Sequence, residues 1–187
     1  MAGLSAPDLP LLAGYAEELR SSVRHMLAEQ RLAPYLAQRY PESHSLRSDA
    51  LLYEHVLALK QRHLRNAPPL AKVHYDTTLR RAQQALGTLT TVSRVQGSRL
   101  KVKREIRIAA LFKDAPAPML QMIVVHELAH LKHSEHDKAF YALCEHMLPG
   151  YAQIEFDTRL YLTALPPAAA LTPPLPAAPT LQRRSPR

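Results

Sequence analysis

The sequence predicts an α+β domain in which helices precede and follow one small antiparallel sheet. Three observations lead to this prediction. Apolar residues recur at helical spacing before residue 65, alternate at period two between residues 99 and 108, and return to helical spacing after residue 118. A chain of 187 residues, of which 47% are hydrophobic, is long and apolar enough to bury one core.

The N-terminal part is expected to be mainly helical. One helix should begin after Ser48, a good N-cap residue, and end at the Asn-Ala-Pro-Pro stretch of residues 66–69. An earlier helix is expected over residues 23–40, with a break or bend at Pro34, because proline cannot donate a helical hydrogen bond. A shorter helix is expected over residues 79–86, since a glycine follows it.

The sheet is expected in the middle of the chain. β-Branched residues are common over residues 88–110, and Gln-Gly-Ser at residues 96–98 is typical of a turn between two strands. From residue 99 onward, basic residues occupy odd positions and apolar residues even ones, so the two kinds face opposite sides of a strand. Arg104 interrupts this alternation, which indicates a bulge or turn. The cations on or near the basic face, candidate ligands for a phosphate chain, are Arg94, Arg99, Lys101, Lys103 and Arg107.

Helices are expected again in the last part of the domain. The first should begin at Pro118 and continue to Lys132, and two more should cover residues 138–148 and 152–165. Pro149 and Gly150 between these two segments mark the end of one helix and the start of the next.

Composition limits the class of protein. Residues 166–187 contain seven prolines without apolar periodicity, so we expect one domain over residues 1–165 and a disordered, basic Pro/Ala-rich tail. The net charge of +8 favours an anionic partner, although three of these charges lie in the tail. A single cysteine, Cys144, excludes an intrachain disulfide and points to a reducing cytoplasm. No apolar run is long enough for a membrane span.

The segment VVHELAHLKHSEH, residues 124–136, carries the strongest chemical signal. His126 and His130 lie one helical turn apart, so both imidazoles can bind one metal ion. Glu127 lies beside the first of them and can act as general base on a water bound to that ion. This is the HExxH pattern of zinc hydrolases. It predicts a divalent metal, with Zn²⁺ first and Ni²⁺, Mn²⁺, Co²⁺ and Mg²⁺ as alternatives.

The third ligand has to come from beyond the helix. His133 lies on the same helical face but about 10 Å further along the axis, so it cannot complete a tetrahedral corner. A break in the chain at residues 132–136 would bring His136 back to the first pair, and we therefore expect His136 as the third ligand. The open alternatives are Glu145 and Glu155 as third ligands, and Asp157 as acceptor of a ligand's second N–H or as a surface salt-bridge partner.

The sequence resembles the YgjP-like metallopeptidase-domain family. The likeness is carried by VVHELAHLKHSEHDKAFYALCEHMLPGY and by RNAPP, VSRVQG, EIRIA and EFDTRLYLT, so it covers nearly the whole chain except the tail. It implies a compact zincin-like α+β fold and a metal-dependent hydrolase. By this resemblance the metal ligands are His126, His130 and His136, and the general base is Glu127. Members close to this type are described as nucleoside triphosphate pyrophosphatases acting on UTP.

Three functions remain open at this stage. The preferred one is hydrolysis of a nucleoside triphosphate, chiefly because of the resemblance and secondarily because the basic face can bind phosphates. The second is a small zinc metallopeptidase, in which an edge strand would pair with the substrate backbone. The third is a nucleic-acid-associated protease that uses the basic face and the tail for binding. In the first two cases the partner is a small nucleotide or a peptide, without a membrane.

Overall fold

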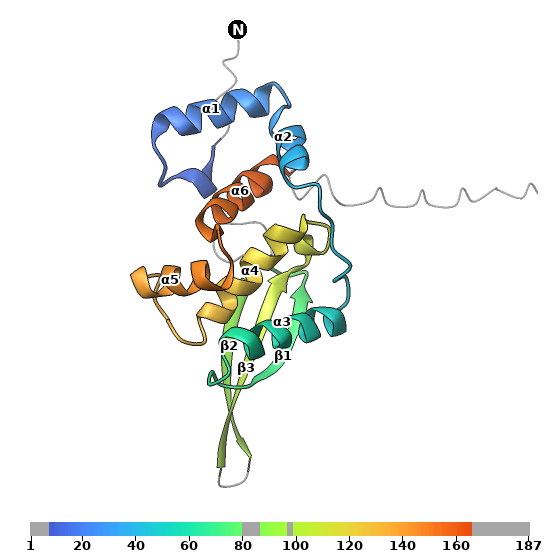
Figure 1. The fold of residues 1–187 in the computed structure, drawn as a ribbon, viewed down its shortest axis with the longest axis vertical. Helices are drawn as coiled ribbons and strands as arrows, with labels where there is room; N and C mark the ends of the chain where they lie inside the picture. Colours follow the sequence, from blue (N-terminus) through green and yellow to red (C-terminus); the bar gives the residue numbers. More distant parts are fainter. Residues whose placement is uncertain (1–7, 80–86, 97–98, 166–187) are drawn as a thin grey trace, which may run out of the picture.

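A computed structural model describes residues 8–79, 87–96 and 99–165, and for residues 87–96 and 99–102 it describes the backbone only. It confirms the α+β class (Figure 1). The elements are η1 (Pro10–Leu12), α1 (Glu17–Ala28), α2 (Leu32–Arg39), α3 (Asp49–His63), β1 (Leu70–Asp76), β2 (Gly87–Gln96), β3 (Arg99–Ala109), η2 (Ala110–Lys113), α4 (Ala117–Ala129), α5 (Lys138–Met147) and α6 (Tyr151–Ala164).

The sheet is mixed rather than purely antiparallel. Its strand order is β1-β3-β2, with β2 antiparallel and β1 parallel to β3. The expected antiparallel pair is present, and the difference comes from β1, a strand for which the sequence had given no prediction. Val73 and Tyr75 of β1 are buried, so this strand adds apolar side chains to the core. An irregularity was expected at Arg104 in β3. The structure has one in the neighbouring strand β1, where the register shifts between Leu70, the partner of Arg104, and Lys72.

The hairpin of β2 and β3 is longer than the rest of the sheet. β1 pairs only with the stretch of β3 from Arg104 to Ala109, whereas β2 pairs with β3 over its whole length. Residues 92–96 and 99–103 therefore form a two-stranded extension. Figure 1 shows this extension projecting beyond the helices, with no other element beside its far end.

The helical predictions are confirmed with shifted ends. α3 starts where predicted, and the Ser48 side chain accepts a hydrogen bond from the backbone N–H of Leu51. The break between α1 and α2 precedes Pro34, and Gln30 adopts a left-handed conformation with φ of 57° there. Pro34 itself lies in the first turn of α2, where its missing N–H costs no helical hydrogen bond. The helix expected over residues 79–86 lies outside the described residues.

α4 is the central element of the fold. It packs against β2 and β3 of the sheet on one side and against α5 and α6 on the other. Nine of its residues are buried, among them Met119, Ile123 and Leu128. A second apolar cluster, which includes Leu12, Leu36 and Leu160, joins η1, α1 and α2 to α6. α6 therefore lies between the N-terminal helices and α4, as Figure 1 shows.

None of the helices in the described ranges combines the length and the apolar content that a bilayer crossing requires.

Candidate metal centre

Three histidine side chains converge where α4 passes into α5. His126 lies in the last turn of α4, His130 is the C-cap residue, and His136 lies in the connecting loop. The Nε2 atom of His126 lies 3.3 Å from that of His130 and 3.1 Å from that of His136. All three ligand atoms lie within 4.8 Å of one another, and within the described residues they form the group that could hold a metal ion.

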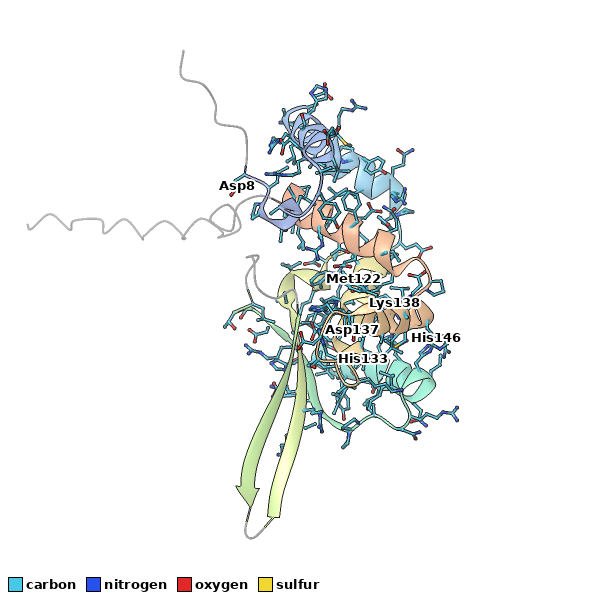
Figure 2. All side chains as sticks on the ribbon, turned by 90° about the vertical axis from the view of Figure 1, so that its left-hand side faces the viewer. Asp8, Met122, His133, Asp137, Lys138 and His146 are labelled. Atoms are coloured by element: carbon cyan, nitrogen blue, oxygen red, sulfur yellow. The ribbon has the colours of Figure 1, made fainter. Side chains whose placement is uncertain are left out.

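The chain reaches this arrangement because α4 ends early. The helix stops at Ala129, three residues before the predicted end at Lys132. The chain then folds back in a tight turn, because the backbone N–H groups of Lys132 and His133 both donate to the carbonyl of Ala129. α5 then begins at Lys138, and the carboxylate of its N-cap residue Asp137 accepts the N–H of Phe140 at 2.8 Å. Figure 2 labels His133, Asp137 and Lys138 along this connection.

The ring of Phe140 packs against all three imidazoles. Its ring centroid lies 5.0 Å from that of His126, 4.8 Å from that of His130 and 4.7 Å from that of His136. The side chain is fully buried. Because one rigid ring contacts all three, it limits the directions in which they can tilt.

The second nitrogen of two of these rings is also held. Nδ1 of His130 lies 2.9 Å from the carbonyl oxygen of His133, and a carbonyl can only accept, so this nitrogen carries the proton. Nδ1 of His126 lies 2.7 Å from the hydroxyl of Tyr151, the first residue of α6. Both contacts leave Nε2 facing the centre, as a metal ligand requires. His133 thus contributes its backbone, and its own side chain is not part of the three-histidine group.

The electrostatic environment favours the neutral form of two of the rings. Burial, followed by the neighbouring histidines and the cation of Arg159, lowers the pKa of His126 to about 3. Burial also lowers the pKa of His130. A neutral imidazole is the form that binds a metal, so the donor set fits a divalent ion.

Glu127 is the buried acid next to this centre. It follows His126 in α4 and is only 3% exposed. The other buried acids of the described residues, Asp76 and Asp157, have arginine partners. Asp157, a candidate acceptor for a ligand N–H, accepts instead from the Tyr40 hydroxyl at 2.6 Å and pairs with Arg39 at 2.9 Å. It joins α6 to α2, in a buried rather than a surface position.

The two rival third ligands have other partners. Glu145 accepts the backbone N–H of Gly150, the residue that precedes α6, at 2.7 Å. Glu155 accepts a hydrogen bond from Arg159 at 2.6 Å. Neither belongs to the group of converging ligand atoms, so the residues that the structure brings together are the three expected histidines.

The expected basic face is divided between two parts of the sheet. Arg107 lies in the three-stranded part, where its guanidinium donates twice to Asp76 and once to Thr78. The exposed Lys103 lies on the two-stranded extension. Arg94, Arg99 and Lys101 also belong to the extension, and their side chains lie outside the described part. A role for any of these residues in substrate binding stays a prediction.

Sequence reasoning missed Tyr151 and Arg159. Both belong to α6, in which the sequence had indicated only Glu155 and Asp157 as candidate site residues. The signal was present in the four-residue spacing of Tyr151, Glu155 and Arg159, which puts all three on one helical face. What the spacing could not show is that this face turns toward α4.

Comparison with known proteins agrees with this geometry. The profile of the family described as "YgjP-like, metallopeptidase domain" matches residues 17–158. The chain belongs to the YgjP-like family. It is also similar to a UTP pyrophosphatase of Escherichia coli (strain K12), with 56% identity over 158 residues that cover 84% of this chain and 95% of that relative. No solved structure matches the chain significantly.

Family membership bears on two of the sequence predictions. The prediction of a hydrolase of the YgjP-like family is confirmed. A divalent-metal site is supported by the metallopeptidase-type domain and by the three-histidine group.

Proposed function

We propose that this YgjP-like hydrolase is a metal-dependent nucleoside triphosphate pyrophosphatase that acts on UTP. In this reaction water attacks the α-phosphorus, the bond between the α-phosphorus and the bridging oxygen breaks, and UMP and pyrophosphate are released. The observation that supports it most is the convergence of three imidazole Nε2 atoms, one of them from the histidine that directly precedes the buried Glu127. The similarity to a UTP pyrophosphatase supports the choice of substrate.

His126, His130 and His136 would hold the ion, with Tyr151 and the His133 carbonyl fixing two of the rings. Three neutral imidazoles favour Zn²⁺, Ni²⁺ or Co²⁺ over Mg²⁺ and Mn²⁺, which prefer oxygen ligands, so we propose Zn²⁺ first. When bound, such an ion supplies Lewis acidity, which polarises a phosphoryl oxygen and lowers the pKa of water.

Glu127 would remove the proton from the attacking water. It directly follows His126 in the last turn of α4, and its burial keeps bulk water away from the carboxylate. A general base of this kind contributes about 10²- to 10⁴-fold to the rate. The residues that orient the rings keep the centre fixed during the proton transfer.

A small metallopeptidase is the second candidate function. The observation in its favour is β2, which is an edge strand of the sheet and packs against α4. An extended peptide could pair with such an edge beside the centre. The third hypothesis, a nucleic-acid-associated protease, has only the net charge in its favour.

A panel of substrates and metals tests the proposal. The purified chain is loaded with Zn²⁺, Ni²⁺, Co²⁺, Mn²⁺ or Mg²⁺ and assayed with the four ribonucleoside triphosphates and with casein, with Glu127→Gln as control. We expect stoichiometric UMP and pyrophosphate from UTP in the wild type and almost none in the variant. Cleavage of casein without turnover of any nucleotide would instead establish the peptidase.

A further inference from the structure

The face of α6 that begins at the metal centre ends at an arginine. Tyr151 contacts His126, and Glu155 and Arg159 follow at intervals of four residues on the same face. Eight residues of helix correspond to about 12 Å along the axis. An arginine side chain that reaches back from this position and a triphosphate chain that starts at the centre can together span such a distance.

Arg159 has hydrogen-bonding capacity that the fold does not use. One guanidinium nitrogen donates to Glu155 at 2.6 Å, and a second makes a long 3.5 Å contact with the carbonyl of Leu11. The third, Nε, is buried without an acceptor in the parts of the chain that the structure describes. The side chain is still 35% exposed, so a ligand can reach it.

The surroundings of Arg159 are open and aromatic. Tyr141 is 41% exposed, and its ring centroid lies 6.4 Å from that of His136 and 6.4 Å from that of Tyr151. Tyr15 is 38% exposed and lies 5.1 Å from Phe156, the neighbour of Glu155.

We propose that Arg159, which pairs with Glu155 in the free protein, binds the β- and γ-phosphates of a nucleoside triphosphate whose α-phosphorus lies at the three-histidine centre. This inference rests on the proposed function. A planar guanidinium suits two phosphate oxygens better than a point charge does, because it donates two parallel hydrogen bonds. In this proposal α6 binds the phosphates, a role that the sequence analysis had suggested for the basic face of the strand.

The test measures nucleotide affinity separately from turnover. Arg159→Gln should raise the KM for UTP by about 10- to 100-fold and change kcat much less, because a charged hydrogen bond to substrate is lost. Calorimetric titration of the metal-loaded protein with uridine 5′-(α,β-methylene)triphosphate should show the same loss. UMP, which lacks the β- and γ-phosphates, should bind the variant and the wild type equally. Arg159→Lys should recover part of the affinity.

Glu155→Gln separates a binding role from a purely structural ion pair. Removing the carboxylate takes away a competitor of the phosphates, so the affinity for the analogue should stay within about 3-fold of wild type or increase. If Arg159 only stabilised α6, both variants would lower the unfolding temperature alike and neither would change KM. Arg47→Gln, which breaks an exposed pair with Asp114, is the neutral control. Metal content is measured for every variant.

The failures of the two proposals are distinguishable. If the wild type hydrolyses UTP and Arg159→Gln binds the analogue as tightly as the wild type, only the role of Arg159 is wrong. If Lys103→Gln raises KM more than Arg159→Gln does, the phosphates bind at the hairpin. If the metal-loaded wild type neither binds the analogue nor hydrolyses any nucleotide, the proposed function fails and the role of Arg159 with it.

Discussion

Two parts of the molecule each pair an arginine with a carboxylate: the sheet, and the region where α6 packs against α4, which we call the helical corner. The two pairs differ in the hydrogen bonds that each guanidinium makes. Arg107 of the sheet directs two of its nitrogens to one oxygen of Asp76, and one of these also donates to Thr78. Arg159 of α6 makes one short bond to Glu155 and keeps a buried Nε without an acceptor in the described ranges. The first pair holds the end of β1 against β3, whereas the second lies on the face of α6 that begins at the metal centre.

The difference teaches that a count of basic residues does not locate a binding site. The hairpin contains most of the candidate cations, but its two-stranded extension projects beyond the helices (Figure 2). The helical corner has fewer cations, and there the possible metal ligands, the buried acid and an accessible guanidinium are connected through α4 and α6. We therefore expect substitutions in the corner to affect activity and substitutions in the sheet to affect mainly stability.

The largest effect should come from Glu127→Gln. The amide has nearly the same shape but cannot accept the proton of the attacking water, so kcat for UTP should fall by about 10²- to 10⁴-fold. Metal content, measured by atomic absorption, should stay at the wild-type level. Substantial remaining turnover in this variant would remove Glu127 from the role of base.

The next largest effect should be a difference in metal affinity between the variants of His136 and His133. His136→Ala removes a proposed ligand and should weaken metal binding by several powers of ten. His133→Ala should leave it nearly unchanged, because residue 133 contributes a backbone carbonyl that alanine retains. Competition with a chromogenic chelator measures both affinities. The opposite ranking would mean that the ligand assignment is wrong.

A smaller effect is expected for Tyr151→Phe. It removes the hydroxyl that contacts Nδ1 of His126 but keeps the buried ring, so metal affinity should fall by about 10- to 100-fold with little change in fold. Tyr40→Phe is the matched control, since it also removes a hydroxyl bonded to a buried partner, Asp157, away from the centre. Equal metal affinities in the two variants would show that Tyr151 does not position His126.

The smallest effect on activity should come from Asp76→Asn in the sheet. Hydrogen bonds from Thr78, and then the Arg107 guanidinium, hold the pKa of Asp76 well below its usual value. This carboxylate therefore stabilises the fold above its ordinary pKa, and the contribution is lost as the pH falls. The variant should unfold at a lower temperature at pH 7 and depend less on pH between about pH 5 and pH 3. Its kcat and KM for UTP should match the wild type, and a clear rise in KM would connect the sheet to substrate binding.

The sequence was sufficient to predict those features that depend on residues close together in the chain. Caps and apolar spacing located α3, α4, α5 and α6, and the distance along a helix excluded His133 in favour of His136. Where contacts join distant segments the predictions failed or were missing. β1 pairs parallel to the last part of β3, with the whole of β2 between them in the sequence, and no local pattern encodes such a pairing. Tyr151 meets His126 only because α6 packs across α4.

The ring of Phe140 also has a consequence for how the apoprotein behaves. The same residue lies under all three imidazoles and receives the N-terminal cap of its helix from Asp137, the residue that directly follows His136. Any chelator that lets the imidazoles separate must disturb this turn as well. Loss of the ion would then be detectable as faster amide hydrogen exchange at the start of α5, and occupancy could be followed without any substrate.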